Sequence, residues 1–469
     1  MNAARQAFPP SQLRERLTSV LDHLEAGLIE RGRIVRLAFL AALAGEHTLL
    51  VGPPGTAKSE LARRLHLAFA AARYFERLLT RFTVPEELFG PLSISALEQD
   101  RYERMTAGFL PQATIGFIDE VFKANSAILN ALLTLLNERE FDNGAGRERC
   151  PLISVIGATN EVPADEVAEA FFDRFLMRLP VGPVSASGFR SLLELDAEKP
   201  AAVPQPLAEA DLAALKAGAA AVRLPGDVAE LLAELRALLA AEQVYVSDRR
   251  WVKVAWLLKV AAGSEQRAAV AIWDLWLLPW CVAPSVERQA SIAAWLTGRL
   301  GLQAGMAPPL LTRVVEAFEA QASLEQQAED LDYDEEGRLR FSADLDSQVN
   351  DAKGASQSVR MSYRRQRRYG ENHIGARVRQ IDELIARIAG YAQAIAASRA
   401  ELAAYTGQSI WLDREFAAQA DANLAATSEA IEALRLRAIA ARHAFMTLPR
   451  REVDPGGVPE PVTVSDLPA

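Results

Sequence analysis

The chain has 469 residues, of which 50% are hydrophobic, and a formal net charge of −10. This length predicts two or three domains rather than one core, and the acidic balance does not favour a nucleic-acid-binding protein. Two cysteines and no apolar run of roughly 20 residues exclude a disulfide scaffold and a membrane-spanning helix, so a cytoplasmic protein is expected.

The first part of the chain predicts alternating helices and strands. Apolar residues at three- to four-residue spacing predict helix over residues 12–44. A short apolar strand, Thr48–Val51, then leads into GPPGTAKS and a helix from Ser59 to about Ala72. A strand, a helix and another strand follow at Ile115–Ile118, Ser126–Arg139 and Ile153–Ala158. This alternation predicts an α/β fold, a parallel sheet with helices on both faces that binds ligands beyond the carboxyl ends of its strands.

The second part of the chain predicts helices. The proline-rich stretch EKPAAVPQP indicates a linker, and residues 207–300 predict helices rich in Ala and Leu with many core tryptophans. Residues 325–371 are polar. From Ile374 to Phe445 the apolar spacing, broken at TGQS, predicts an antiparallel helical hairpin of coiled-coil type. The tail after Pro449 is expected to be disordered.

The most informative motif is the glycine-rich loop GPPGTAKS, Gly52–Ser59. Its glycines let backbone N–H groups gather around a phosphate, and the following helix N-terminus adds a positive field. Lys58 would reach the β- and γ-phosphates, and the Ser59 hydroxyl would hold Mg²⁺. Because the strict pattern has Gly where this chain has Ala57, the loop alone fits a plain strand–turn–helix junction equally well.

Two other strands end in polar residues. IGFIDE ends in Asp119 and Glu120, and two like charges at the end of a buried strand need a cation, which Mg²⁺·ATP supplies. Asp119 would orient the Mg²⁺ and Glu120 would polarise the attacking water, although a solvated turn is the alternative. Asn160 follows the strand ISVIGATN, where an amide either hydrogen-bonds the γ-phosphate and the water or simply caps a turn. Together these motifs predict an ATPase that uses ATP and Mg²⁺.

In this order, and followed by DRF at Asp173–Phe175, the motifs resemble the MoxR group of AAA+ ATPases, most closely its regulatory ATPase variant A (RavA) branch. The resemblance also includes TRFTVPEELFGPLSI, AILNALLTLLNERE and YVSDRRW, and the family tends to have Ala before the loop lysine. It implies an AAA+ core at 1–190 and an all-α lid at 205–305. A helical C-terminal domain at 306–448, which contains a polar insertion at 325–371, and a tail at 449–469 would follow.

The resemblance implies a role for each matched residue. Lys58 and Ser59 belong to Walker A, Asp119 and Glu120 to Walker B, and Asn160 is sensor 1. Ser59 and Asp119 would hold the metal, and Lys58, Glu120 and Asn160 would take part in catalysis. The remaining residues that would surround the nucleotide in the loop are Gly52, Gly55, Thr56, Ala57 and Glu60.

Arginines outside the loop also match family positions. Arg174 matches the arginine finger, which would reach the γ-phosphate bound by the neighbouring subunit; an intrachain ion pair with Asp173 is the alternative. Arg249 matches sensor 2, and the motif does not decide whether it contacts its own nucleotide or a neighbour's. Arg250 is expected to be a surface arginine. Ile29 resembles part of the apolar wall for adenine, with plain core packing as the alternative.

The resemblance also bears on partners. Residues 85–111 resemble the family's helix-2 insertion hairpin, and Asn143-Gly144 predicts a second hairpin in EFDNGAGRERC; each either touches a substrate or is a passive loop. Residues 331–371 lack the small β-domain that binds a decarboxylase in the RavA branch, so that partnership is not expected. What the resemblance implies is a homo-oligomeric ring of six that remodels or chaperones a protein client, with a von Willebrand factor A domain companion.

Two other functions stay open. A nucleotide-gated scaffold would bind ATP without hydrolysis, although Glu120 and Arg174 argue against it. A nucleic-acid motor is the less favoured alternative, because Arg364–Arg368, flanked by Tyr363 and Tyr369, form a basic–aromatic cluster. Such charge runs are more often solvated helix flanks.

Overall fold

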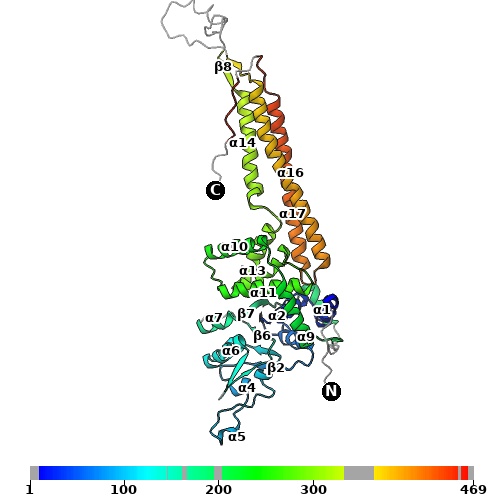
Figure 1. Cartoon of the computed structure of the whole chain (residues 1–469), viewed down its shortest axis with the longest axis vertical. Helices are drawn as coiled ribbons and strands as arrows, with labels where there is room; N and C mark the ends of the chain where they lie inside the picture. The colour runs from blue at the N-terminus through cyan, green and yellow to red at the C-terminus, as the bar shows by residue number, and fades with distance from the viewer. Residues whose placement is uncertain are drawn as a thin grey trace, which may run out of the picture. The chain divides into compact units, whose positions relative to one another are not determined.

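The computed structural model describes residues 10–144, 146–160, 166–194, 203–331, 364–452 and 456–462. The chain divides into two compact units (Figure 1). The first consists of the residues up to Leu300 together with Tyr405–Ala417, and the second of Gly301–Ala404 with the residues from Ala418 onward. In the described part of the chain, no helix combines the length and the apolarity needed to cross a bilayer.

The first unit contains a five-stranded sheet in the order β2-β3-β6-β1-β7, with every neighbouring pair parallel. Its strands are β1 His47–Val51, β2 Tyr74–Leu78, β3 Ile115–Asp119, β6 Ser154–Thr159 and β7 Phe175–Pro180. The central strands are buried along nearly their whole length, which explains their continuous apolar sequence. The predicted parallel sheet is confirmed, and the residues that follow β1, β3 and β6 share one edge of it.

Helices flank this sheet (Figure 1). The helices of this part of the chain include α2 Gly32–Ala44, α3 Lys58–Leu67, α6 Ser126–Glu138, α7 Glu166–Phe172 and α8 Ala186–Leu193. The N-terminus of α6 is capped by Asn125, whose Oδ1 accepts from the Ile128 N–H at 3.0 Å. Its apolar face lies in the core, where Ile128, Leu132 and Leu135 are fully buried.

The N-terminal helical prediction was wrong in one respect. Residues 12–44 form two helices, α1 Pro10–Glu25 and α2, and not one. Gly27 and Glu30 lie between them with positive φ angles of 70° and 57°, which no helix accommodates. The helix after the glycine-rich loop also ends at Leu67 rather than Ala72, and Ala71 has a φ of 53°.

The two expected hairpins turned out differently. Residues 140–150 do form one, with β4 Glu140–Asn143 and β5 Gly146–Arg149 paired antiparallel. Residues 85–111 instead contain two short helices, α4 Glu86–Phe89 and α5 Ile94–Leu97, closed by one isolated antiparallel bridge between Leu92 and Arg104. Prolines in this segment, PEELFGPLSI, have no N–H for a longer strand ladder.

The rest of the first unit is helical, as predicted. Its helices are α9 Glu209–Ala221, α10 Gly226–Ala241, α11 Asp248–Ser264, α12 Leu278–Val282 and α13 Val286–Arg299. Of the tryptophans here, Trp273 is fully buried, in keeping with a core role. The segment Tyr405–Ala417 belongs to the same unit, where Trp411 donates its indole N–H to Ser264 Oγ at 2.8 Å.

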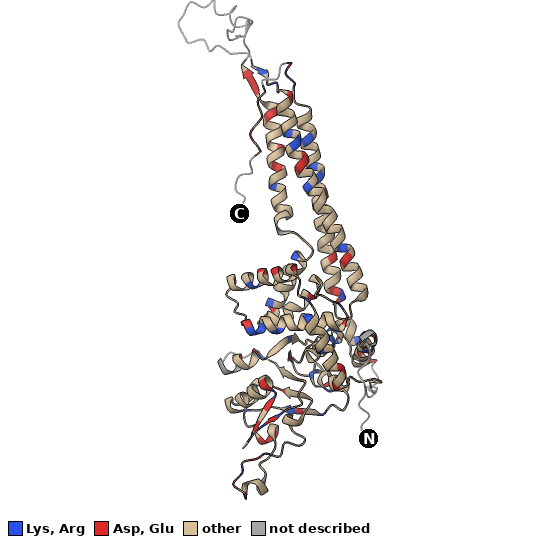
Figure 2. Ribbon diagram, in the orientation of Figure 1, with Lys and Arg blue, Asp and Glu red and all other residues tan. Residues whose placement is uncertain are grey.

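The second unit is built from three long helices, α14 Pro308–Gln327, α16 Glu371–Gln408 and α17 Arg414–Met446, of which the last two continue into the first unit. Both acidic and basic residues are distributed along them (Figure 2). Arg442 pairs with Asp382 at 2.6 Å and Arg399 with Asp421 at 2.8 Å. These ion pairs join the start of one helix to the end of the other, which confirms the predicted antiparallel hairpin.

The structure describes only parts of the polar insertion and of the tail. Within the insertion, β8 Glu329–Leu331 pairs antiparallel with β9 Arg364–Gln366, and the intervening residues lie outside the described ranges. The tail was expected to be disordered, yet its described residues make contacts: Arg377 donates to the Glu460 carbonyl at 2.6 Å, and Tyr369 bridges to Arg450. Residues 453–455 and 463–469 are not described.

Candidate active site

The glycine-rich loop joins the carboxyl end of β1 to the N-terminus of α3. Gly52 donates its N–H to the Thr159 carbonyl at 2.9 Å, which ties the loop to the end of β6. A Cβ at Gly52 would lie 2.1 Å from the Val181 carbonyl oxygen, so only glycine fits there. Lys58, the first residue of α3, donates to the carbonyls of Gly52 at 2.6 Å and Pro53 at 3.0 Å. The lysine ammonium therefore lies inside the curl of the loop.

Ala57 and Gly55 give the loop its curvature. Both are in the left-handed region, with φ angles of 66° and 78°. Gly55 meets no atom within 4 Å of an added Cβ, so the loop is open at that point. For an alanine the left-handed conformation costs roughly 1–2 kcal/mol. The loop thus keeps the backbone shape that a glycine at position 57 would favour, at a small cost in strain.

Two polar strand ends face the loop lysine. Glu120 follows Asp119 at the end of β3 and has a φ of 50°, a strained conformation for a non-glycine residue. Its Oε1 accepts from Asn160 Nδ2 at 2.6 Å, and Asn160 Oδ1 accepts from Lys58 Nζ at 3.3 Å. Asp119 Oδ1 accepts the Glu120 N–H at 3.0 Å. The structure therefore brings Lys58, Asp119, Glu120 and Asn160 together at one edge of the sheet, where three separate strands end.

The charges at this edge influence one another. Burial lowers the pKa of Lys58, and the charges of Asp119 and Glu120 act in the opposite direction. Lys123 lies 3.3 Å from Glu120 Oε2, so a second cation is close to that carboxylate. Within the described ranges, the cations recorded near these two carboxylates are therefore Lys58 and Lys123, and such a site can accept a further cation carried by a ligand.

Two other predicted contact residues have partners within the chain. Glu60 accepts from Arg64 Nε at 2.9 Å, so its carboxylate is paired along α3. Thr56 donates its hydroxyl to the Pro53 carbonyl at 2.9 Å, which stabilises the loop itself. Ser59, the second residue of α3, is half-buried. Of these three residues, Ser59 keeps a hydroxyl that has no hydrogen-bond partner among the described residues.

The sequence context had suggested that Ile29 lies on a helix, but it does not. It is half-buried in the turn between α1 and α2. Its neighbour Arg31 reaches the loop directly, because Nε donates to the Thr56 carbonyl at 3.4 Å and Nη2 to the Gly182 carbonyl at 2.7 Å. Sequence reasoning missed Arg31, since no local pattern distinguishes it from the arginines around it.

The donor atoms at this edge suit Mg²⁺ bound together with phosphates. Mg²⁺ prefers oxygen ligands and usually takes one or two protein groups beside substrate phosphates. Ser59 offers a hydroxyl and Asp119 a carboxylate. Among the described residues no group of three or more His, Cys, Asp or Glu could hold a metal ion alone. The residues thus fit a cation that arrives with a nucleotide.

Arg174 lies at the amino end of the strands, which is the edge of the sheet opposite the carboxyl end where Lys58 lies. It precedes β7, whose first residue, Phe175, pairs with His47 at the amino end of β1, whereas Lys58 follows the carboxyl end of β1. Five strand residues span about 16 Å at roughly 3.3 Å each. Arg174 is 3.7 Å from Asp173, and its buried Nε has no hydrogen-bond partner in the described part of the chain. The expected alternative, an ion pair with Asp173, is present only as this long contact.

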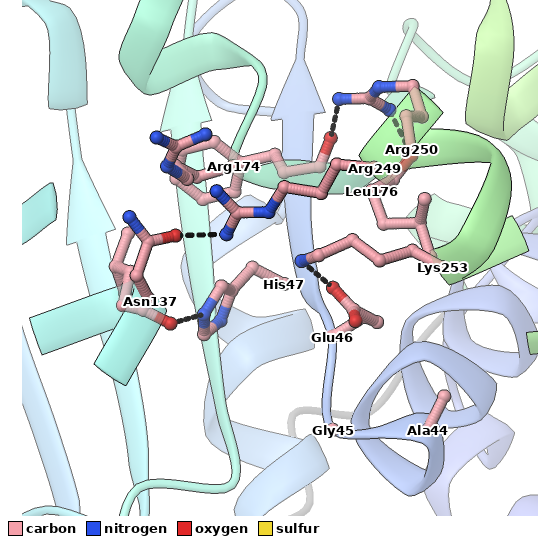
Figure 3. Close-up of polar contacts among 12 residues, drawn as sticks. Ala44, Gly45, Glu46, His47, Asn137, Arg174, Leu176, Arg249, Arg250 and Lys253 are labelled. Atoms are coloured by element: carbon pink, nitrogen blue, oxygen red, sulfur yellow. Dashed lines mark hydrogen bonds and ion pairs between the residues drawn. The ribbon is translucent and has the colours of Figure 1, made fainter. Parts of the chain in front are cut away.

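Arg249 lies beside Arg174 (Figure 3). It is in the first turn of α11 and donates from Nη2 to Asn137 Oδ1. Burial, followed by the positive charge of Arg249, lowers the pKa of Arg174. The two guanidinium groups that the sequence singled out therefore meet, at the edge of the sheet away from their own glycine-rich loop.

The prediction for Arg250 was wrong. It was expected on the surface but is 3% exposed. Its Nε donates to the Asp173 carboxylate at 2.9 Å, and its other nitrogens donate to the carbonyls of Asp173, Phe175, Leu176 and Cys281. The spacing of apolar residues along α11 could not reveal the burial of Arg250, because this burial is imposed by β7 and α12, which pack around the side chain. Arg250 is a structural link between the helical region and the sheet.

Replacing Arg250 with alanine is expected to lower the free energy of unfolding by about 3–5 kcal/mol, because the change leaves a carboxylate and several buried carbonyls without a donor. Chemical denaturation of the two proteins measures the difference. Arg236→Ala is the matched control, since Arg236 makes only an exposed ion pair with Asp248. Equal destabilisation by both substitutions would contradict the structural role of Arg250.

Comparison with known proteins adds family information to this geometry. A family model described as the MoxR domain in the MoxR-vWA-beta-propeller ternary systems matches residues 15–217, and one for an AAA lid domain matches residues 227–296. The uncharacterized protein MJ0079 of Methanocaldococcus jannaschii is 41% identical over 271 residues, which cover 57% of this chain and 70% of the relative.

Two more distant similarities agree with these matches. Protein MoxR of Paracoccus denitrificans is 28% identical over 180 residues, which cover 37% of this chain and 52% of that protein. A solved structure from Cytophaga hutchinsonii, described as a candidate ATPase, has 18% identity and a TM-score of 0.50, and the match covers 60% of this chain and 91% of that one. At this identity the structural match shows the fold alone.

Proposed function

The chain belongs to the MoxR-type AAA+ ATPases, and on that premise we propose that it binds Mg²⁺·ATP at the carboxyl edge of its sheet and hydrolyses it within a homo-oligomeric ring. The observation that carries the proposal is the contact chain from Lys58 through Asn160 to Glu120, which joins the glycine-rich loop to two strand ends. A strand–turn–helix junction without ligand would have no use for this set of groups.

The residues then divide the work of hydrolysis. The backbone of Gly52–Ser59 surrounds the phosphates, and Lys58 exchanges its contacts with the loop carbonyls for the β- and γ-phosphates. Ser59 and Asp119 would hold Mg²⁺, which neutralises charge on the phosphates when bound. Glu120 accepts a proton from the attacking water, and Asn160, hydrogen-bonded to Glu120, orients that water.

We propose that Arg174 and Arg249 both act on the nucleotide of a neighbouring subunit. Both lie at the amino edge of the sheet, about a full strand length from their own loop. A guanidinium there stabilises the charge that spreads over the oxygens of the transferring phosphoryl group. For Arg249 this placement favours contact in trans, the point that the motif alone does not decide. The ring of six subunits that the family resemblance implies is part of the same proposal.

The cellular role is proposed on family grounds. The matched family model is named for MoxR-vWA-beta-propeller ternary systems, which supports a von Willebrand factor A domain companion. The remodelling or chaperoning of a protein client in the cytoplasm is the role that the family resemblance adds to this proposal. The long hairpin of α16 and α17 supports placement near the regulatory ATPase variant A branch. The separate match of an AAA lid model supports a lid at 205–305, after a core at 1–190 and before a helical domain at 306–448.

The basic–aromatic cluster gives little support to a nucleic-acid motor. Tyr369, expected to be available for base stacking, is 7% exposed and donates its hydroxyl to the Glu325 carbonyl at 2.9 Å. Arg367 lies 3.8 Å from Asp330. Tyr363 lies outside the described residues, as does the side chain of Arg364. Tyr369 and Arg367 are therefore engaged within the second unit.

Titration calorimetry with Mg²⁺·ATP tests the nucleotide site. The wild-type chain is expected to bind, and Lys58→Ala to weaken binding by about ten- to a hundredfold, the range for loss of a charged hydrogen bond. Lys216→Ala, an exposed lysine on α9, is the control and should bind like the wild type. Absence of heat for the wild type, or equal affinity of the Lys58 variant, would contradict the site.

A further inference from the structure

The last turn of α6 reaches the two arginines at the amino edge of the sheet (Figure 3). Asn137, in that turn, accepts a hydrogen bond through Oδ1 from Nη2 of Arg249. Arg249 comes from a different element, the first turn of α11. The contact therefore fixes an arginine of the helical region to a helix that packs in the core of the sheet domain.

The turn that carries Asn137 is itself held firmly. His47 Nδ1 accepts the Val155 N–H at 2.9 Å, and its Nε2 lies 3.2 Å from the Leu136 carbonyl oxygen and 2.8 Å from Arg139 Nη1. Burial, and then the charge of Arg139, lowers the pKa of His47, which keeps the ring neutral. On the other side of Asn137, Arg139 donates to the Gly45 carbonyl at 2.7 Å. The backbone on both sides of Asn137 is thus anchored, which restricts the positions that its exposed side chain can take.

The charges around the two arginines favour a neutral hydrogen-bond acceptor beside them. Arg174 and Arg249 are like charges in close proximity, and after burial the charge of Arg249 is the next cause that lowers the pKa of Arg174. Asp173, whose carboxylate lies 3.7 Å from Arg174, forms its shorter ion pair with Arg250, at 2.9 Å. An amide oxygen orients a guanidinium without cancelling its charge, whereas a carboxylate at the same place would form an ion pair.

We propose that Asn137 is a positioning residue that aligns Arg249 with the phosphates of the neighbouring subunit's nucleotide. The inference rests on the proposed function, since it assigns Asn137 a role only through Arg249. It also explains the residue type: an acidic side chain at this position would compete with the phosphate for the same guanidinium, and an apolar one would leave two repelling arginines without alignment.

Steady-state ATP turnover of full-length variants tests this role. Asn137→Ala is expected to lower kcat by about tenfold with little change in KM, because its own nucleotide pocket is intact and an interaction made in the transition state is lost. In an Arg249→Ala background the same substitution should have no further effect, since Asn137 acts only through Arg249. Asn137→Asp should be at least as slow as Asn137→Ala. Asn130→Ala, an exposed asparagine on the same helix, should match the wild type.

Several outcomes would overturn the proposal. Wild-type turnover of Asn137→Ala, or the same fold-loss with and without Arg249, would show that Asn137 does not act through Arg249. Wild-type turnover of Asn137→Asp would remove the argument for a neutral acceptor. Unchanged turnover of Arg249→Ala itself would overturn the proposed role of Arg249, and this inference with it. Equal melting temperatures of the Asn137→Ala and Asn130→Ala proteins would show that a loss of turnover comes from positioning and not from a loss of stability.

Discussion

Replacing Arg174 with alanine is expected to lower ATP turnover by about a thousandfold or more, the range observed for loss of an arginine finger. The physical reason is that the developing charge on the transferring phosphoryl group loses its guanidinium partner. ATP binding should remain near the wild-type level, because Arg174 lies at the edge of the sheet away from its own loop. Phosphate release and calorimetry on the same preparation measure both quantities.

Two further variants sharpen this test. Arg174→Lys keeps the charge but loses the planar fork, so it should recover only a small part of the rate. Arg190→Ala, an exposed arginine on α8, should turn over like the wild type. An Arg174→Ala protein that keeps more than a tenth of the wild-type turnover would rule out a finger role for this residue.

Replacing Glu120 with glutamine is expected to lower ATP turnover by about a hundred- to a thousandfold, a typical loss for removal of a general base. The amide keeps an oxygen that can accept from Asn160 Nδ2, as Glu120 Oε1 does at 2.6 Å, but it can no longer take a proton from water. The protein should therefore bind Mg²⁺·ATP and hold it without hydrolysis. Single-turnover measurements with bound ATP distinguish this state from lost binding.

Glu98→Gln, at an exposed position after α5, is the matched control for Glu120→Gln and should not change turnover. Equal turnover of Glu120→Gln and the wild type would remove the catalytic base from the proposal and favour the nucleotide-gated scaffold. Loss of ATP binding in Glu120→Gln would instead indicate that the carboxylate supports the loop, through Asn160 and Lys58, more than the chemistry.

The sheet and the nucleotide edge were predictable because their signals are local. An apolar run that is buried on both faces and then ends in charged or amide residues specifies both a strand and the edge at which its chemistry lies. Asp119, Glu120 and Asn160 were found in this way. The glycine-rich loop belongs to the same class, because Gly52 and Gly55 are set by close backbone approach and positive φ.

The arginine edge was only partly predictable, because its geometry depends on contacts between distant segments. Arg249 and Arg250 are sequence neighbours on α11, yet one meets Asn137 and the other is surrounded by carbonyls of β7 and α12. The two adjacent arginines in the sequence give no basis for predicting which of them is buried. The same holds for Arg31, whose link to Thr56 depends on the turn between α1 and α2 that the helical periodicity did not reveal.

The central claim is that the pocket at one edge of each subunit is completed by the arginine at the opposite edge of a neighbour. Co-expression of Lys58→Ala and Arg174→Ala chains with different tags, and purification through both tags, gives assemblies that contain both variants. Each variant alone should be inactive, whereas the mixed assembly should regain ATP turnover, because Lys58→Ala subunits present Arg174 to intact pockets. Turnover of the mixed assembly no higher than that of the separate variants would contradict the claim.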